Sequence, residues 1–382
     1  MKVRSLKLQD TRFGNRWFDE VEHRWDHDDF LANKEWQQGW ISFDCAIYRP
    51  EEDRVYLGIT CFDANGIFKA FDRKTDQFID LGYHRVADPF DAKFHRSLVA
   101  GPDGCLYAAP ALLHCPDKHL RAPGAAIVSY DPAGGKIEKL GVPLPHVYVQ
   151  SLAIDAARAT LYLLCFPPEY LVSYDLGTGE AKILALVGSG YGGMAQGENI
   201  VLDDEGCVWS GWSLTRAWQH EPGPDAFRLA KYDPRQDRMV FFKKGLPLPD
   251  GRYGYAKTEG LFNLGDGMIY ASGANGSLYR VDRSSGEAEL LFTPTPDRRS
   301  RLSSLVKTEE GIAYGVTGRD GNCELMRVDY RDGKFEKLGR IADESGAAMH
   351  QCHHLIATPD GVIYACENDN PYRSSYLWEI TL

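Results

Sequence analysis

The sequence lacks the features that mark membrane-spanning and secreted proteins. No apolar run is long enough to cross a bilayer, and the N-terminus MKVRSLKLQD has neither the apolar core nor the cleavage site of a signal peptide. None of the nine cysteines belongs to a Cys-x-x-Cys pair, so we expect reduced thiols rather than a disulfide framework. These absences predict a cytoplasmic protein with no membrane partner.

Positive charge is also scarce. There are 43 Lys and Arg against 54 Asp and Glu, which gives a net charge of −11 and argues against a nucleic-acid partner. The sequence contains no Gly-x-Ser-x-Gly elbow, Walker loop or His-Glu-x-x-His motif, so serine hydrolase, nucleotide and zincin chemistry have no support. We therefore expect no organic cofactor.

Glycine and aromatic residues, by contrast, are abundant and recur in a pattern. The chain has 38 glycines, and seven times an aromatic residue closes a short strand that follows a turn. These aromatics are Tyr56, Tyr107, Tyr162, Trp209, Tyr270, Tyr314 and Tyr364. Their spacing of roughly 40–60 residues is typical of propeller blades with four strands each. The sequence thus predicts an all-β fold, a seven-bladed β-propeller.

The two ends of the chain complete one blade. A third strand ending in Asp follows most hairpins, as at Asp72 and Asp131, but only one strand, Tyr376–Leu382, follows Tyr364. The N-terminal strand Lys2–Leu8 is expected to supply the missing outer strand and so close the ring. Residues 1–382 then form a single propeller domain, with residues 9–42 as an extra segment packed on the ring and a short helix within HRWDHDDF.

The second hairpin carries a pair of histidines. His95 precedes its first strand, Ser97–Ala100, and His114 follows its second, Cys105–Ala109, with a Gly-Pro-Asp-Gly turn between them. The start of one hairpin strand lies beside the end of the other, so the two imidazoles are expected to be neighbours. Loops at the ends of rigid strands are also where binding sites tend to occur.

Other polar residues are expected on the same face of the propeller. Alignment of the hairpins places Asp44 and Cys352 at positions equivalent to His95, and the candidate substrate-binding residues are Arg96, Tyr148, Arg301 and Asp44. Basic residues gathered on one face of an acidic protein suggest an anionic oligosaccharide as the partner. In MHQCHH, the thiol of Cys352 and the imidazoles of His350 and His354 suit a structural zinc ion.

These features resemble the seven-bladed β-propeller polysaccharide lyases of the ulvan-lyase and rhamnose–glucuronate-lyase group. The resemblance rests on the seven blades, on His95 in FHRSL and His114 in ALLHC, and on the Cys/His cluster of the last blade. It implies cleavage next to a uronic acid by β-elimination, with His95 and His114 in proton transfer and charge neutralisation. The group adds a tyrosine and an arginine. Tyr148 and Tyr191 each head a blade, and we prefer Tyr191 because Arg216 lies at the far end of its hairpin whereas Tyr148 has no such arginine.

Two other classes of function remain open. One is a propeller hydrolase, either a rhamnosidase or a metal-dependent lactonase. A lactonase would need a metal ion on the propeller axis, and Asp44 and Asn199 are the available ligands for it. The other is a non-catalytic propeller that binds a sugar or a protein. The Gly-His and Trp-Asp signature of WD40 repeats is missing, which disfavours a protein-interaction scaffold.

Overall fold

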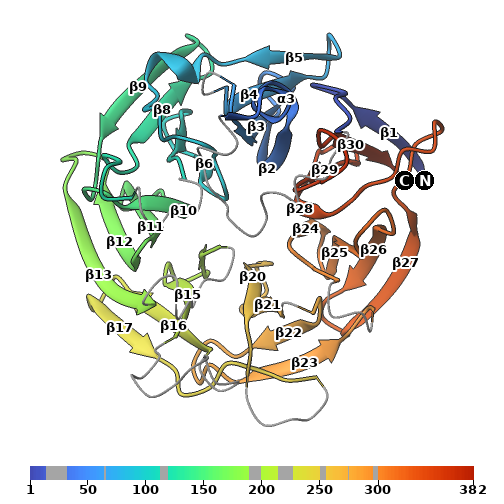
Figure 1. Ribbon diagram of the computed structural model, residues 1–382. Helices are drawn as coiled ribbons and strands as arrows, with labels where there is room; N and C mark the ends of the chain where they lie inside the picture. Colours follow the sequence, from blue (N-terminus) through green and yellow to red (C-terminus); the bar gives the residue numbers. More distant parts are fainter. Residues whose placement is uncertain are drawn as a thin grey trace. The chain divides into compact units, whose positions relative to one another are not determined.

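Seven four-stranded antiparallel sheets make up most of the described chain, and they form an all-β, seven-bladed β-propeller. This computed structural model describes residues 1–13, 32–63, 66–111, 119–188, 199–213, 227–249, 255–273, 275–295 and 300–382. Figure 1 shows the sheets in order along the chain, and each blade is one sheet. The predicted fold class is confirmed.

The chain divides into two compact units. The first contains residues Met1–Val149, Arg319–Cys323 and Gly339–Leu382, and the second contains Gln150–Gly318 and Glu324–Leu338.

The first unit contains the blades in which most of the predicted site residues lie. Blade one has strands β2 (Ile41–Arg49), β3 (Arg54–Cys61), β4 (Phe68–Asp72) and β5 (Gln77–Asp80). Blade two has β6 (Leu98–Ala100), β7 (Leu106–Ala108), β8 (Ile127–Asp131) and β9 (Lys136–Gly141). Blade seven has β28 (Cys352–Ala357), β29 (Val362–Glu367), β30 (Leu377–Thr381) and β1 (Lys2–Leu6). A 3₁₀ turn, η1 (Tyr83–Arg85), follows blade one.

The second unit contains four further blades. Blade three has β10 (Tyr148–Asp155, whose first two residues belong to the first unit), β11 (Thr160–Phe166), β12 (Glu169–Asp175) and β13 (Ala181–Gly188). Blade four has β14 (Val201–Leu202), β15 (Val208–Trp212), β16 (Arg228–Asp233) and β17 (Arg238–Phe241). Blade five has β20 (Thr258–Phe262), β21 (Ile269–Gly273), β22 (Leu278–Val281) and β23 (Ala288–Phe292). Blade six has β24 (Leu305–Glu309), β25 (Ile312–Thr317), β26 (Glu324–Asp329) and β27 (Lys334–Arg340, whose last two residues belong to the first unit). A two-stranded ribbon, β18 (Leu246–Pro247) with β19 (Tyr255–Ala256), precedes blade five.

Side-chain hydrogen bonds at the turns explain the repeated aromatic residue. The Tyr107 hydroxyl donates to Asp103 at 2.7 Å, and the Tyr270 hydroxyl donates to Asp266 at 2.8 Å. In blade four the Trp209 indole N–H donates to Asp203 at 2.9 Å. In these three blades the aromatic body is buried and its polar tip is satisfied by the aspartate of its own hairpin turn. The Tyr364 hydroxyl instead donates to Glu379, and the Tyr56 hydroxyl has no hydrogen-bond partner among the described residues.

The aspartate that ends the third strand also has a local structural role. The Asp72 carboxylate accepts hydrogen bonds from the backbone N–H groups of Lys74 and Thr75, at 3.1 and 3.0 Å. Asp175 does the same for Gly177 and Thr178. These Asx turns lead the chain into the fourth strand, which is why the marker recurs at a fixed place in each repeat.

The N-terminal strand completes blade seven. β1 pairs antiparallel with β30, from Lys2 opposite Thr381 to Leu6 opposite Leu377. The predicted pairing is thus confirmed, although the strand ends at Leu6 rather than at Leu8. Closing the last blade with the first strand leaves β30 paired on both sides.

The described part of the 9–42 segment packs against blade seven. Helix α3 (Lys34–Gly39) begins at Asn33, whose side-chain oxygen accepts from two backbone N–H groups. Trp36 and Trp40 are buried, and the Trp40 indole donates to the carbonyl of Asn370. The segment ends at residue 40, because Ile41 already begins β2. The helix expected within HRWDHDDF lies outside the described residues.

An ionic network joins the outer parts of blades one and seven. Arg73 donates to Asp53 at 2.7 Å, to Asp360 at 2.6 Å and to the Tyr364 hydroxyl at 3.1 Å. Its side chain is only 16% exposed, so these charges are less screened than those of an ordinary surface pair.

Replacement of this arginine is expected to weaken the junction of the two blades. We predict that Arg73→Met lowers the free energy of unfolding by about 1–2 kcal/mol, because several charge-assisted hydrogen bonds are lost together. Urea unfolding measures the change, with Arg331→Met as control, since Arg331 makes one exposed ion pair with Glu310. Equal effects of the two substitutions would contradict a role for the network.

Candidate functional site

Side chains from three blades of the first unit meet around His95. The His95 ring lies in edge-to-face contact with the ring of His353, with centroids 4.7 Å apart and planes at 67°. The Arg96 guanidinium donates to the carbonyl of His353 at 2.9 Å. A ring nitrogen of His353, Nδ1, lies 2.5 Å from the carbonyl oxygen of Asp44. We call these four residues, Asp44, His95, Arg96 and His353, the inner cluster.

The inner cluster is mostly buried. His95 is 9% exposed, Arg96 7%, Asp44 2% and His353 1%. The Asp44 carboxylate accepts a hydrogen bond from the Thr60 hydroxyl at 2.6 Å. Lys93, two residues before His95, is 9% exposed as well. The cluster therefore combines one carboxylate with an arginine, a nearby lysine and two imidazoles in a region largely shielded from water.

Two β-bulges place the residues from β2 and β28. In the β2–β3 ladder the register shifts between Phe43 and Cys45, and in the β28–β29 ladder it shifts between Cys352 and His354. Asp44 and His353 are the residues left out of the pairing. A bulge turns a side chain out of the regular alternation, which is how these two residues reach the cluster.

The same bulge occurs in the second unit and corrects the alignment made from the sequence. In the β20–β21 ladder the register shifts between Thr258 and Gly260, so Glu259 is left out of the pairing there. The positions equivalent to Asp44 are therefore Glu259 and His353, and His353 lies one residue later than the predicted Cys352. Sequence reasoning missed His353 because the turn-based alignment could not detect an extra residue in a strand.

The predicted zinc ligands are not grouped around one point. Cys352 donates to the carbonyl of His354 at 3.6 Å, and burial raises the pKa of its thiol to about 12. His354 Nδ1 accepts from the backbone N–H of Ala46 at 3.3 Å, and burial, with Arg96 nearby, lowers the pKa of this imidazole to about 3. His350 lies beside Asp320 instead. Among the described residues, no three His, Cys, Asp or Glu side chains are arranged to hold a metal ion, and the zinc site stays a prediction.

Three of the four residues proposed for catalysis are not tested. His114, Tyr191 and Arg216 all lie outside the described residues. The neighbourhood of His95 and His114 thus stays a prediction, and the structure shows His353 as a ring partner of His95.

Two of the three remaining candidates have structural partners, whereas the buried hydroxyl of the third, Tyr148, has no hydrogen-bond partner among the described residues. Tyr148 is buried at the start of β10, and burial raises the pKa of its hydroxyl. In the second unit, Arg301 forms an ion pair with Glu259 at 2.8 Å. Asn199, considered for a lactonase metal, exchanges two hydrogen bonds of 2.8 Å with the backbone of Leu261. Its amide is thereby engaged with the chain itself.

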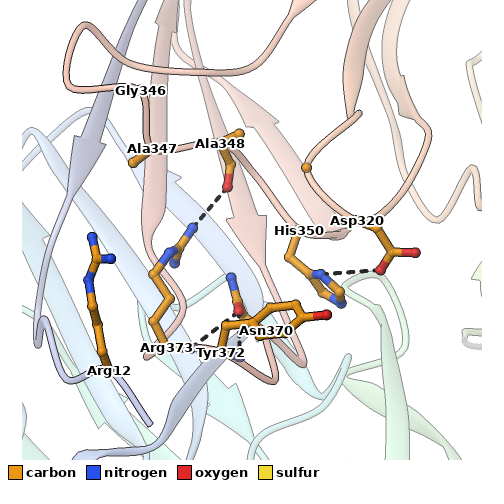
Figure 2. Close-up of a pocket in the computed structure, with 10 residues that line it drawn as sticks. Arg12, Asp320, Gly346, Ala347, Ala348, His350, Asn370, Tyr372 and Arg373 are labelled. Carbon is orange, nitrogen blue, oxygen red and sulfur yellow. Dashed lines mark hydrogen bonds and ion pairs between the residues drawn. The ribbon is translucent and has the colours of Figure 1, made fainter. Parts of the chain in front are cut away.

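A cavity of about 310 Å³ lies on blade seven (Figure 2). Its polar lining residues are Arg12, Asp320, His350, Asn370, Tyr372 and Arg373. No sequence pattern predicts this cavity, because its walls come from four separate parts of the chain. The only local signal is the polar stretch ENDNPYRSS between β29 and β30.

Comparison with known proteins supports the fold. No protein-family model and no curated protein sequence matches this chain. A structure of RRP9 WD40 repeats is similar over 90% of this chain and 94% of its own, with 9% identity and a TM-score of 0.59. A chain of the mitotic checkpoint complex is similar over 91% and 93%, with 12% identity and a TM-score of 0.59. The β-propeller domain of Cps50 (Swd1) from Myceliophteria thermophila is similar over 89% and 97%, with 13% identity and a TM-score of 0.54. At these identities the likeness establishes the propeller fold and no function.

No helix in the described ranges has the length and apolar character needed to cross a bilayer.

Proposed function

We propose that this protein is a non-catalytic propeller that binds an anionic oligosaccharide at the inner cluster. The observation that carries the proposal is the meeting of Arg96, His95 and His353 at the beginnings of strands from blades two and seven. Carboxylate and sulfate groups are the natural partners of an arginine flanked by imidazoles.

The geometry favours recognition because the cluster is held in place before any ligand arrives. The guanidinium of Arg96 is oriented by the His353 carbonyl, and the His353 ring is oriented by the Asp44 carbonyl. Groups fixed in this way lose little conformational entropy when they bind a ligand, which increases affinity.

The test is isothermal titration of the full chain with a sulfated or uronate-containing oligosaccharide and with its neutral counterpart. We expect binding of the anionic ligand only, weakened about tenfold or more by Arg96→Gln, because a charge-assisted hydrogen bond is worth about 1.5–3 kcal/mol. Arg327→Gln is the matched control, since Arg327 is a partly exposed residue of β26. His95→Gln, a second variant, tests the cluster if Arg96→Gln does not fold. Equal binding of the neutral ligand, or none of either, would overturn the proposal.

β-Elimination is a second candidate, supported by the contact between two imidazoles beside an arginine. In that reaction a base removes the C5 proton, the C4–O bond breaks, and the leaving oxygen takes up a proton while a cation neutralises the carboxylate. The product contains a C4–C5 double bond conjugated with the carboxylate and absorbs in the ultraviolet. A rise in absorbance with uronate oligosaccharides that His95→Ala removes would replace the binding proposal with a lyase.

A further inference from the structure

The cavity on blade seven shares no residue with the inner cluster. Its walls are the loop before β28, the loop between β29 and β30, and two shorter contributions, one from Arg12 and one from Asp320 with Gly321. A volume of about 310 Å³ is at the lower end of the range for small-molecule pockets. The cavity therefore suits a ligand no larger than a small metabolite.

Two charged groups of the cavity wall already have partners of opposite charge or polar neighbours. Both terminal nitrogens of Arg373 donate to the carboxylate of Glu367, which is fully buried, at 2.9 Å. The Asp320 carboxylate pairs with Arg319 at 3.8 Å and lies 3.5 Å from Nδ1 of His350. Neither Arg373 nor Asp320 therefore calls for a charged group on a ligand.

The cation that a ligand would meet is Arg12. This residue is exposed, and its backbone bridges that of Arg373, which ties it to the rim of the cavity. Asp10, the carboxylate that lies within electrostatic range of Arg12, already accepts hydrogen bonds from Lys7 and from the Tyr376 hydroxyl. One guanidinium matches a carboxylate, which carries one negative charge, more closely than a phosphate ester, which carries nearly two.

A neutral polar group lies on the other side. Figure 2 shows His350 across the cavity from Arg12. His350 is only 4% exposed, and within the described chain its Nε2 atom has no hydrogen-bond partner. Buried polar atoms are nearly always hydrogen-bonded, so an unsatisfied one in a cavity wall points to a group that a ligand supplies. A hydroxyl both donates and accepts, and it therefore suits this nitrogen in either tautomer of the ring.

An exposed aromatic ring lies beside this imidazole. Tyr372 is 53% exposed and is in edge-to-face contact with His350, with centroids 6.4 Å apart. Its backbone N–H donates to the Asn370 side chain at 3.0 Å, which fixes the start of the side chain at the cavity wall. A tyrosine combines an apolar ring with a polar tip. Such a ring suits a ligand that has both C–H groups and hydroxyls, as sugars do.

We infer that this cavity is a second binding site, and that it takes a small hydroxylated carboxylate of the sugar-acid class, an aldonate or a uronate. The carboxylate of the ligand pairs with Arg12, one of its hydroxyls bonds to Nε2 of His350, and its C–H groups pack on the ring of Tyr372. A neutral sugar would leave the arginine without a partner, and a carboxylate without hydroxyls would leave the imidazole nitrogen without one.

Isothermal titration of the full chain with D-gluconate, D-glucuronate and D-galacturonate, one at a time, tests this inference. For the acid that binds best, three comparison ligands follow: the neutral compound with CH₂OH in place of the carboxylate, hexanoate, which has no hydroxyls, and glucose 6-phosphate. We expect the first two to bind about tenfold more weakly or worse, because each loses one of the two polar contacts. Failure of all three acids to bind, comparison ligands that bind equally well, or tighter binding of the phosphate ester would overturn the inference.

Variants at the cavity assign the contacts. Arg12→Gln is expected to weaken binding of the sugar acid about tenfold but to leave the neutral compound unaffected, because that compound has no carboxylate to lose. Tyr372→Ala should weaken both ligands several-fold, whereas Tyr372→Phe, which keeps the ring, should bind the acid within about twofold of the wild type. Arg12→Gln that weakens both ligands alike, or Tyr372→Ala that weakens neither, would contradict the assignment.

A further pair of variants separates this site from the proposed oligosaccharide site. Arg96→Gln should leave binding of the sugar acid unchanged, and Arg12→Gln should leave binding of the anionic oligosaccharide at the inner cluster unchanged, because the two sites share no residue. Loss of sugar-acid binding in Arg96→Gln would place that ligand at the inner cluster and overturn the inference. Arg327→Gln, the control used for the inner cluster, should change neither.

Discussion

Glu367→Gln is expected to lower the free energy of unfolding by about 3–5 kcal/mol, the usual cost of leaving a buried charge without its partner. The Glu367 carboxylate is fully buried in blade seven. It accepts hydrogen bonds from both terminal nitrogens of Arg373 and from the backbone N–H groups of His350 and Tyr376. The side chains of Asn370 and Trp378 donate to it as well.

The physical reason is that glutamine has nearly the shape of glutamate but lacks its negative charge and one of its two acceptor oxygens. Its NH₂ group would face donors where the carboxylate presents an acceptor, and the Arg373 cation would remain buried without a counter-charge. Urea unfolding followed by circular dichroism measures the loss. Glu344→Gln, at an exposed position in the loop before β28, is the control and should change stability by less than about 0.5 kcal/mol. A loss below about 1 kcal/mol for Glu367→Gln would show that the hydrogen bonds of this carboxylate are not the main support of the loop.

Asp91→Asn is expected to make the protein more stable at pH 7.5 while leaving it nearly unchanged at pH 4. Asp91 is 5% exposed, and burial raises the pKa of its carboxyl to about 6. One carboxyl oxygen accepts from the Tyr83 hydroxyl and from the backbone of Asp88, both at 2.8 Å. The other has no hydrogen-bond partner among the described residues.

The sign follows from the raised pKa. The folded protein holds the Asp91 proton more tightly than the unfolded chain, so the stability from this group is present in full below about pH 4 and is lost as the pH rises through about 6. A rise from 3.8 to about 6 corresponds to about 3 kcal/mol at neutral pH. Asparagine is neutral throughout and keeps an acceptor oxygen for Tyr83, so the variant should lose this pH dependence.

Urea unfolding of the wild type and Asp91→Asn at pH 4 and pH 7.5 measures the difference. The other charged groups near Asp91 are Asp88, which raises its pKa, and Lys139, which lowers it. Both are present in the variant, so comparison of the two proteins isolates Asp91. Asp63→Asn, an exposed position in the loop after β3, controls for the change in net charge. A stability difference that is the same at both pH values would contradict the raised pKa.

The residues that could be predicted from the sequence are those whose role is local. Several of the repeated aromatics, and the aspartates that end the third strands, bond to atoms within a few residues, as Tyr107 does with Asp103 and Asp72 with Thr75. Such interactions recur at fixed spacing, so the seven blades and the pairing of β1 in the last one could be counted without the structure.

The site depends on interactions that spacing cannot reveal. The alignment missed His353 because a bulge in β28 shifts the register by one residue, so that alignment on the turns points to Cys352 instead. In the sequence, Cys352 and His354 have the side chains of metal ligands. In the structure, the Cys352 thiol donates to a carbonyl and the His354 imidazole accepts from a backbone N–H. The hydrogen-bond partners of these two residues depend on which groups lie next to them in the fold, and their order in the sequence does not reveal those groups.

The amino-acid sequence by itself determined the all-β class, the seven blades and the closure of the last blade, because periodic turns and strand patterns are encoded within each repeat. Only the tertiary structure decided which side chains meet at the inner cluster and around the blade-seven cavity. Arg12, Asp320, His350 and Tyr372 are far apart along the chain. They line one cavity because strand pairing and the buried Glu367 carboxylate bring their loops together.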